Sequence, residues 1–439
     1  MDQQISALLQ KDNPWIGNPD ALTPWLKEHL PLKYLGRNQL LEKQTRWTQQ
    51  GKAHLLIGPR QAGKSTLIWQ WIFANKREAL FIDCEQPLIR SWCESAPQVA
   101  MDIKEGFSKV PILFFEEVQH LENAGLFFKG LVDRKPGAPI LVTGSSSYHL
   151  RSQTRESLAG RATRARLLPF SLEEVSGELD SLAPLGRSKK QDELLERHMV
   201  FGGYPEVWLS SHPERILTDL LESFVIRDAS DLYQIKRPDA FRTLLSLAAR
   251  QVGSLVNVSE WAQILSVSRE TVYSYLEILS SAHILELVRP FAGGKRSELT
   301  KSAKVFWIDL GLRNRLLANF QPLDQRQDRG PLLENWVYTE IIKSIPTLAE
   351  VFFWRSTSGA EVDFVIRNAN QLAALEVKSA QSPRKKITRS MRSFIDAYQP
   401  KSFCVVHPGI QSQETIASTK IDWLPPAQVS TWLKHHVSG

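Results

Sequence analysis

Short apolar runs alternate with amphipathic stretches through the N-terminal part of the chain. The runs that predict buried strands are residues 54–57, 79–83, 112–115 and 140–143, with residues 166–168 as a fifth. Between the first two runs, residues 67–73 have the apolar spacing of a helix. Strands that alternate with helices predict an α/β fold with a doubly wound parallel sheet, whose ligands bind at the carboxyl ends of the strands.

The residues after the first predicted strand match the phosphate-binding pattern G-x-x-x-x-G-K-S/T. They are Gly58, Pro59, Arg60, Gln61, Ala62, Gly63, Lys64, Ser65 and Thr66. The strand, loop and helix order fits this pattern, because loop N–H groups and a helix N-terminus must converge on a polyphosphate. Lys64 would bind the β- and γ-phosphate oxygens, and the Ser65 hydroxyl would ligate Mg²⁺. ATP and Mg²⁺ are therefore the predicted cofactors; a plain surface turn is the alternative.

Two acids, Glu116 and Glu117, stand at the carboxyl end of the third predicted strand. An acid at this place belongs to the Mg²⁺ shell, and a neighbouring carboxylate can orient or deprotonate the attacking water. We assign Glu116 to the metal and Glu117 to the water. Glu116 is one methylene longer than the usual Asp. Two acids that only cap a strand at a solvent edge are the alternative.

Two further residues are candidates for contact with the nucleotide. Ser145 follows the fourth predicted strand, and its hydroxyl could contact the γ-phosphate or the attacking water. Arg161 could be supplied to a neighbouring subunit's site, where a guanidinium would neutralise charge in the transition state. A structural Arg161 that pairs with a carboxylate is the alternative.

These motifs together resemble a known family. GPRQAGKST, FFEEVQ, TGSSS, LAGR followed by LLPFSLEEV, and FGGYPEV at residues 201–207 look, in order and spacing, like prokaryotic AAA-superfamily ATPases with a C-terminal domain of unknown function. The resemblance covers nearly the whole chain. It implies an AAA-type P-loop fold, ATP binding and assembly into a homo-oligomeric, hexameric ring.

Length and composition set the organisation and the compartment that we expect. The 439 residues exceed one core, and we predict five segments: an N-terminal segment at 1–45, an ATPase core at 46–200, lid helices at 201–236, a winged helix at 237–300 and a C-terminal domain at 301–439. The three cysteines form no C-x-x-C pair, and no apolar stretch approaches membrane-spanning length. We therefore expect a cytoplasmic protein with no membrane partner.

The predicted winged helix is the first candidate for nucleic-acid binding. Two capped amphipathic helices, residues 259–265 and 268–279, are joined by a tight turn. The second would present Arg269, Glu270, Tyr273 and Ser274, and a basic hairpin would follow with Lys295, Arg296, Lys301 and Lys304. The acid on the presented face argues against base reading, and packing against protein is the alternative role.

A second set of chemical groups lies in the C-terminal domain. Glu334, Asp363, Glu376 and Lys378 look like the D…(D/E)-x-K arrangement of restriction-endonuclease-like α/β folds. Asp363 and Glu376 would end neighbouring strands and share one Mg²⁺, Lys378 would orient the water, and Glu334 would be an outer ligand. An inactive nucleic-acid-binding or docking module is the alternative. The basic stretch Arg384, Lys385 and Lys386 would follow a phosphate backbone in either case.

Three functions remain open from the sequence. The first is a Mg²⁺-dependent ATPase that moves or remodels DNA. It would select DNA by structure, and branched DNA is among the candidate substrates. The second is an ATP-gated switch that binds a protein, and the third is an ATP-regulated nuclease. The net charge of +7 favours polyanionic partners only weakly.

Overall fold

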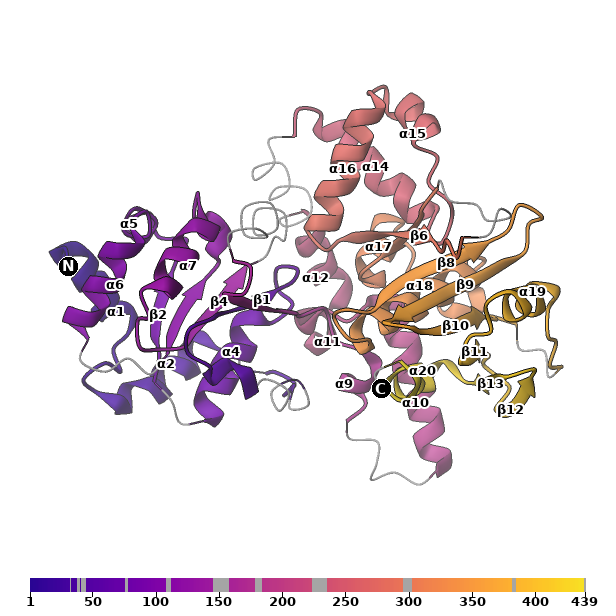
Figure 1. The fold of residues 1–439 in the computed structure, drawn as a ribbon, viewed down its shortest axis with the longest axis horizontal. Helices are drawn as coiled ribbons and strands as arrows, with labels where there is room; N and C mark the ends of the chain where they lie inside the picture. Colours follow the sequence, from indigo (N-terminus) through magenta and orange to yellow (C-terminus); the bar gives the residue numbers. More distant parts are fainter. Residues whose placement is uncertain are drawn as a thin grey trace. The chain divides into compact units, whose positions relative to one another are not determined.

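The computed structural model divides the chain into two compact units, which Figure 1 colours along the sequence. The first unit comprises residues 1–168 with residues 281–283, and the second comprises the rest. The structure describes residues 1–31, 33–37, 40, 45–75, 78–107, 112–144, 158–177, 184–222, 235–294, 302–380 and 384–437. Within these residues, no helix combines the length and the apolar character that crossing a membrane requires.

A five-stranded parallel sheet forms the centre of the first unit (Figure 1). Its order is β2 (Leu80–Asp83), β3 (Leu113–Glu116), β4 (Ile140–Gly144), β1 (Ala53–Ile57) and β5 (Ala162–Arg166). The predicted parallel sheet is therefore confirmed, and four of the predicted strands agree with it to within a residue. The fifth was predicted too late. The true edge strand alternates half-exposed and exposed residues, so it has no apolar run, and buried Leu167 and Leu168 follow its end.

Both faces of the three inner strands are buried, which explains why β1, β3 and β4 are nearly all apolar. Leu113 and Phe115 of β3 point into one apolar layer, while Phe114 points into the other, because side chains alternate along a strand. One layer is closed by α1 (Gln3–Asp12), α5 (Pro87–Trp92), α6 (Ala96–Gly106) and α7 (Ala124–Asp133). The other is closed by α2 (Leu22–His29) and α4 (Lys64–Ala74). The N-terminal residues thus belong to the core of this unit.

An eight-stranded mixed sheet organises the second unit. Its order is β12 (Ser412–Ile416), β13 (Thr419–Leu424), β11 (Ser402–Val406), β10 (Gln371–Val377), β9 (Glu361–Asn368), β8 (Glu350–Arg355), β6 (Leu285–Pro290) and β7 (Lys304–Trp307). β8, β9 and β10 form an antiparallel meander, and β11 then joins β10 in parallel through α19 (Arg389–Tyr398). Across one face lie α18 (Arg329–Ser344) and α20 (Val429–His436), whose apolar residues share a core with the sheet.

Three helices precede strands β6 and β7. They are α14 (Pro238–Arg250), α15 (Val258–Leu265) and α16 (Arg269–Ser281). The Asn257 side chain caps α15, and the Ser268 hydroxyl accepts a hydrogen bond from the Thr271 N–H in the first turn of α16. The turn between these helices uses Ser266 in a left-handed conformation, with φ of 52°. β6 pairs with β7 on one side and β8 on the other, so this hairpin is continuous with the C-terminal sheet.

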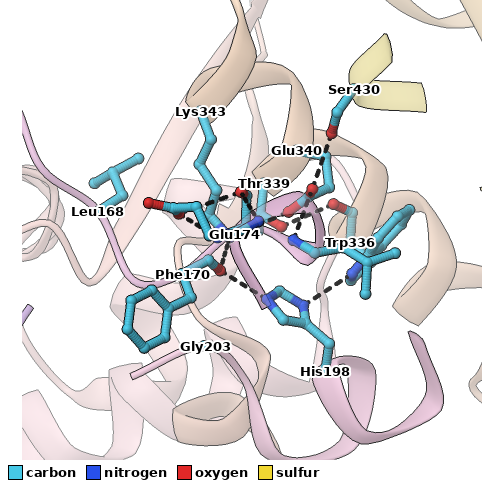
Figure 2. Close-up of polar contacts among 12 residues, drawn as sticks. Leu168, Phe170, Glu174, His198, Gly203, Trp336, Thr339, Glu340, Lys343 and Ser430 are labelled. Atoms are coloured by element: carbon cyan, nitrogen blue, oxygen red, sulfur yellow. Dashed lines mark hydrogen bonds and ion pairs between the residues drawn. The ribbon is translucent and has the colours of Figure 1, made fainter. Parts of the chain in front are cut away.

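A buried histidine fixes the segment that enters the second unit (Figure 2). His198 lies on α10 (Pro184–Phe201), and its Nε2 atom is 2.7 Å from the Phe170 carbonyl oxygen. Its Nδ1 accepts a hydrogen bond of 3.0 Å from the Trp336 indole N–H. These partners require a neutral ring protonated at Nε2. Burial, together with the Lys343 charge, lowers the pKa of His198 to about 3.

A buried carboxylate holds the same segment from the other side (Figure 2). Glu340, fully buried on α18, accepts hydrogen bonds from the Leu172 N–H at 3.1 Å and from the Ser430 hydroxyl at 3.0 Å. The Lys343 ammonium lies 3.3 Å from Glu340 and donates to the Phe170 carbonyl oxygen at 2.9 Å. The residues of the LLPFSLEEV motif are therefore anchored to α18 and α20 by polar contacts within this unit.

Candidate functional site

The phosphate loop connects β1 to α4 at the carboxyl end of β1. Position 58 requires glycine, because a Cβ atom there would lie 1.9 Å from the Leu167 carbonyl oxygen. Gly63 caps α4 with a φ of 89°, in the left-handed region that favours glycine. The loop therefore meets an eleven-residue helix at its N-terminus, where unpaired N–H groups and the helix dipole attract a phosphate group.

Lys64 lies inside this loop. Its side chain is 4% exposed, and its ammonium donates to the carbonyl oxygens of Pro59 at 2.9 Å and Gly58 at 3.2 Å. Burial lowers the pKa of Lys64, while the charges of Glu117 and Glu116 oppose that change. The ammonium is thus held by neutral carbonyl groups, which phosphate oxygens can replace with stronger, charge-assisted bonds.

Ser65 and Glu116 lie together, as the sequence predicts for a Mg²⁺ site. The Ser65 hydroxyl hydrogen-bonds the Glu116 carboxylate, and Glu116 ends β3 beside Asp83 at the end of β2. Burial raises the pKa of Glu116 to about 7, and the charges of Glu117 and Asp83 act in the same direction. Oxygen ligands with surplus negative charge fit Mg²⁺, which would neutralise the charge of nucleotide phosphates. Ser65 and Glu116 would hold this ion.

Glu117 is held in an unusual backbone conformation. Its φ is 51°, a left-handed value that costs a non-glycine residue on the order of 1 kcal/mol or more. The Glu117 N–H donates to the hydroxyl oxygen of fully buried Thr143 at 3.2 Å, and the Gln119 amide hydrogen-bonds the Glu117 carboxylate. Arg60 from the phosphate loop lies 4.0 Å from the same carboxylate. Glu117 is thereby positioned by Thr143 of β4, by Gln119 in the following 3-10 turn and by Arg60 of the phosphate loop.

Thr143 and Gln119 were not recognised as site residues from the sequence. Thr143 lies two residues before Ser145 in the TGSSS motif, so its place near the carboxyl end of β4 was the available signal. Glu85 and His120, which lie 3.3 Å apart, were also not recognised as site residues from the sequence. Among the described residues, three candidate ligand atoms come within 4.8 Å of one another only at Glu85, Glu117 and His120.

The other two predicted nucleotide contacts remain predictions. Ser145 lies outside the described residues. Arg161 directly precedes β5, and its Nε lies 2.6 Å from an Asp133 carboxylate oxygen at the end of α7. Because β5 runs parallel to β1 and its Arg166 pairs with Ile57, Arg161 is at the end of the strand away from the phosphate loop. Five strand residues span about 17 Å, so Arg161 could contact a phosphate group only in the site of another subunit.

The second predicted site, in the C-terminal sheet, is only partly assembled as expected. Asp363 on β9 accepts a hydrogen bond of 2.7 Å from the Val377 N–H on neighbouring β10, so it does lie beside the Glu376 strand. Glu376 is 7% exposed and its Oε1 lies 2.5 Å from the Lys378 ammonium. Lys378 is therefore an ion-pair partner of Glu376 here. Burial, together with the Asp363 charge, raises the pKa of Glu376.

Two residues that were not assigned to this site join it. The Lys304 ammonium lies 3.0 Å from Glu334 on α18 and 2.6 Å from Glu361 on β9. Lys304 does lie on a hairpin strand, because β7 pairs with β6, but its side chain is 4% exposed and it is therefore not part of a basic surface. Glu361 could have been found, since it is two residues before Asp363 and shares its strand face. Burial, with the Asp363 charge next, raises the pKa of Glu334.

Apart from buried Lys304, the predicted nucleic-acid contacts that the structure describes are exposed. Arg384, Lys385 and Lys386 are exposed before α19, and Arg389 and Arg392 are exposed on that helix. On α16, the expected face is exposed, and it comprises Arg269, Glu270, Tyr273 and Ser274, with Glu277 as a second acid. Lys295, Arg296 and Lys301 lie outside the described residues.

Three family models match successive parts of the chain. Residues 50–176 match an AAA domain, and residues 192–323 and 329–424 match two domains of unknown function. The chain is also similar to three uncharacterised proteins. These are MJ1544 of Methanocaldococcus jannaschii (25% identity, over 73% of each chain), Rv2008c of Mycobacterium tuberculosis (27%, over 81% of this chain and 76% of the relative) and a protein of Haemophilus influenzae (23%, over 78% and 86%).

Solved structures resemble the chain more distantly. A Walker-type ATPase of Pyrococcus abyssi, paby2304, has 16% identity and a TM-score of 0.46 over 64% of this chain and 96% of its own. RuvB of Thermogota maritima has 16% identity and a TM-score of 0.29 over 58% of this chain and 90% of its own. These likenesses are too distant to assign a task. The AAA match coincides with the phosphate loop and its acids, so residues 50–176 form an AAA-type domain, which is followed by regions that match domains of unknown function.

Proposed function

We propose that this protein is a Mg²⁺-dependent ATPase that uses ATP turnover to move or remodel DNA. The observation that carries the ATPase part is the assembly of Lys64, Ser65, Glu116 and Glu117 at one edge of the parallel sheet. Each group matches one need of phosphoryl transfer: charge on the phosphates, a metal ligand and a base for water. Mg²⁺ would supply charge neutralisation between the β- and γ-phosphates, while Glu117 would take a proton from the attacking water.

The DNA part of the proposal is supported by the charge around α19. Five exposed cationic residues lie within nine positions, at Arg384, Lys385, Lys386, Arg389 and Arg392. Clusters of this kind bind a phosphate backbone independently of sequence. The exposed face of α16 carries two acids, Glu270 and Glu277, which would repel DNA at a base-reading surface. Binding should therefore select DNA by structure, including branch points, and not by base sequence.

Assembly completes the proposed site. Arg161 stands too far from the phosphate loop of its own chain, and a ring of subunits would present it to the next nucleotide. We therefore propose a homo-oligomeric ring, with six subunits as the family resemblance implies. In this arrangement ATP turnover in one subunit would depend on its neighbour.

The test is ATP hydrolysis by the full chain alone and with single-stranded, duplex and four-way DNA. The proposal predicts Mg²⁺-dependent hydrolysis that rises with DNA, most with the branched form, and that is absent in Lys64→Ala. Hydrolysis without any response to DNA, combined with no DNA binding at low salt, would favour the ATP-gated protein switch instead. Lack of hydrolysis in every condition would contradict the ATPase itself.

A salt titration tests the proposed DNA contact separately. Each phosphate neutralised contributes about 0.9 to the slope of log affinity against log salt. Replacing Arg384, Lys385 and Lys386 with alanine should therefore flatten that slope by up to roughly three units. A matched control removes three exposed cations distant from α19 in the sequence, at Lys11, Lys27 and Lys33. An equal change in both variants would show that only net charge matters.

A further inference from the structure

We propose that Lys304 occupies the place of a divalent cation among the carboxylates of the C-terminal sheet, so that this part of the protein binds no catalytic metal and cuts no DNA. The restriction-endonuclease-like arrangement of Asp363, Glu376 and Lys378 implies a Mg²⁺ ion between the two acids. The residues present do not fit that ion. The cluster belongs to the second unit, whereas the phosphate loop belongs to the first.

The position of the Lys304 ammonium is fixed by its surroundings. It lies 2.6 Å from Glu361 on β9 and 3.0 Å from Glu334 on α18, so one cation joins a strand to a helix. It also lies 5.4 Å from the centre of the Phe353 ring, within the range of a cation–π contact. The side chain is 4% exposed, which leaves solvent little access to the ammonium. A compact cation bound by two carboxylates stands where a metal would otherwise draw them together.

The carboxylates that a metal would need already have other partners. Asp363 accepts a hydrogen bond from the Val377 N–H, and one oxygen of Glu376 binds Lys378. The other oxygen of Glu376, Oε2, is buried and has no hydrogen-bond partner. Within the part of the chain that the structure describes, Glu334, Asp363 and Glu376 do not bring three ligand atoms within 4.8 Å of one another. The cluster is thus arranged around ammonium groups and not around a shared ion.

Charge balance supports the same conclusion. Four carboxylates and three cationic side chains meet in this cluster: Glu334, Glu361, Asp363 and Glu376, with Lys304, Lys378 and Arg355. When all are ionised, one negative charge remains, and a divalent ion would overshoot it. Without Lys304 two negative charges would remain, which a divalent ion would balance. The free Oε2 atom of Glu376 would then be one of its ligands.

The experiment counts Mn²⁺ ions bound per chain, by titration followed with electron paramagnetic resonance, on the full protein without nucleotide. Mn²⁺ prefers the same oxygen ligands as Mg²⁺ and reports its binding directly. The four proteins are the wild type, Asp363→Asn, Lys304→Met and the Lys304→Met/Asp363→Asn double variant. Methionine keeps the length of the buried side chain and removes its charge. Lys385→Met is the matched control for loss of one exposed lysine.

The wild type and Asp363→Asn should bind the same number of Mn²⁺ ions. Lys304→Met should bind one ion more, and the double variant should lose it, while Lys385→Met should match the wild type. A wild-type ion that disappears in Asp363→Asn would overturn the proposal, as would Mg²⁺-dependent nicking of DNA that Asp363→Asn abolishes. A folded Lys304→Met protein that gains no ion would also overturn it. If Lys304→Met does not fold, the comparison of the wild type with Asp363→Asn still decides.

Discussion

The main-chain N–H of Glu117 donates to the hydroxyl oxygen of Thr143 across 3.2 Å, from the end of one strand to its neighbour. This bond stabilises the left-handed conformation of Glu117, whose φ is 51°. The direction of the Glu117 carboxylate therefore depends on a hydroxyl group in β4. Thr143 is a positioning residue in the proposed hydrolysis site.

Replacing Thr143 with valine should slow ATP hydrolysis and leave ATP affinity nearly unchanged. Valine keeps the branched shape but removes the acceptor, so Glu117 loses the bond that fixes its backbone. A loss of one hydrogen bond, about 1.4 kcal/mol in the transition state, corresponds to roughly a tenfold slower turnover. Thr143→Ser keeps the hydroxyl and should retain most activity. Equal rates in the valine and serine variants, measured by steady-state hydrolysis with a separate ATP-binding titration, would contradict this role.

Arg161 should matter for hydrolysis only in the assembled protein. If it reaches a neighbouring site, Arg161→Ala should slow turnover by about 10³-fold or more and keep ATP affinity. Specific activity of the wild type should also rise with protein concentration. Asp133→Asn removes the partner that lies 2.6 Å from Arg161 but keeps the guanidinium, so it should retain hydrolysis. Activity that does not depend on protein concentration would assign Arg161 a structural role. An equal loss of stability in both variants, without a specific loss of turnover, would lead to the same conclusion.

The buried ring of His198 should make the second unit less stable in mild acid. Burial lowers its pKa to about 3 in the folded protein, while an unfolded histidine binds a proton at a pH of about 6.5. The unfolded chain therefore takes up one more proton between these values, and the free energy of unfolding falls as pH decreases below about 6.5. The slope is about 1.4 kcal/mol per pH unit.

His198→Gln separates this effect from other titrating groups. Glutamine can donate to the Phe170 carbonyl oxygen and accept from the Trp336 indole, but it does not titrate. The variant should be less stable than the wild type at neutral pH, and this difference should shrink by about 2 kcal/mol when the pH is lowered to about 5. Denaturant unfolding at both pH values measures it. A constant difference would show that His198 is not the source of the pH dependence.

The ATPase part of the fold was accessible from sequence because its signals are local. The strands are short apolar runs, and the phosphate loop and its two acids follow them directly, so the sheet order brings Ser65 and Glu116 together. The edge strand β5 was misplaced because all of its residues are half-exposed or exposed, so it has no apolar run. The other edge strand, β2, is predicted to within a residue because it keeps an apolar run with alternating burial.

The C-terminal cluster could be predicted only in part. Asp363 and Glu376 lie on neighbouring strands β9 and β10, and Lys378 directly follows β10, so strand periodicity places them near one another. Lys304 comes from a strand thirty residues before Glu334, and nothing in its neighbourhood distinguishes it from an exposed lysine. Its burial follows from the pairing of β6 with both β7 and β8, which is a tertiary property. Long-range ion pairs of this kind leave no periodic signal.

The measurement that tests the central claim most directly is ATP binding and hydrolysis by Glu117→Gln beside the wild type. The amide keeps the size of the side chain and removes the base. We predict ATP affinity within about threefold of the wild type and turnover slower by about 10²-fold or more, in the range that a general base contributes. Wild-type turnover in Glu117→Gln, or loss of ATP binding equal to that of Lys64→Ala, would contradict the assignment of this edge of the sheet as the hydrolysis site.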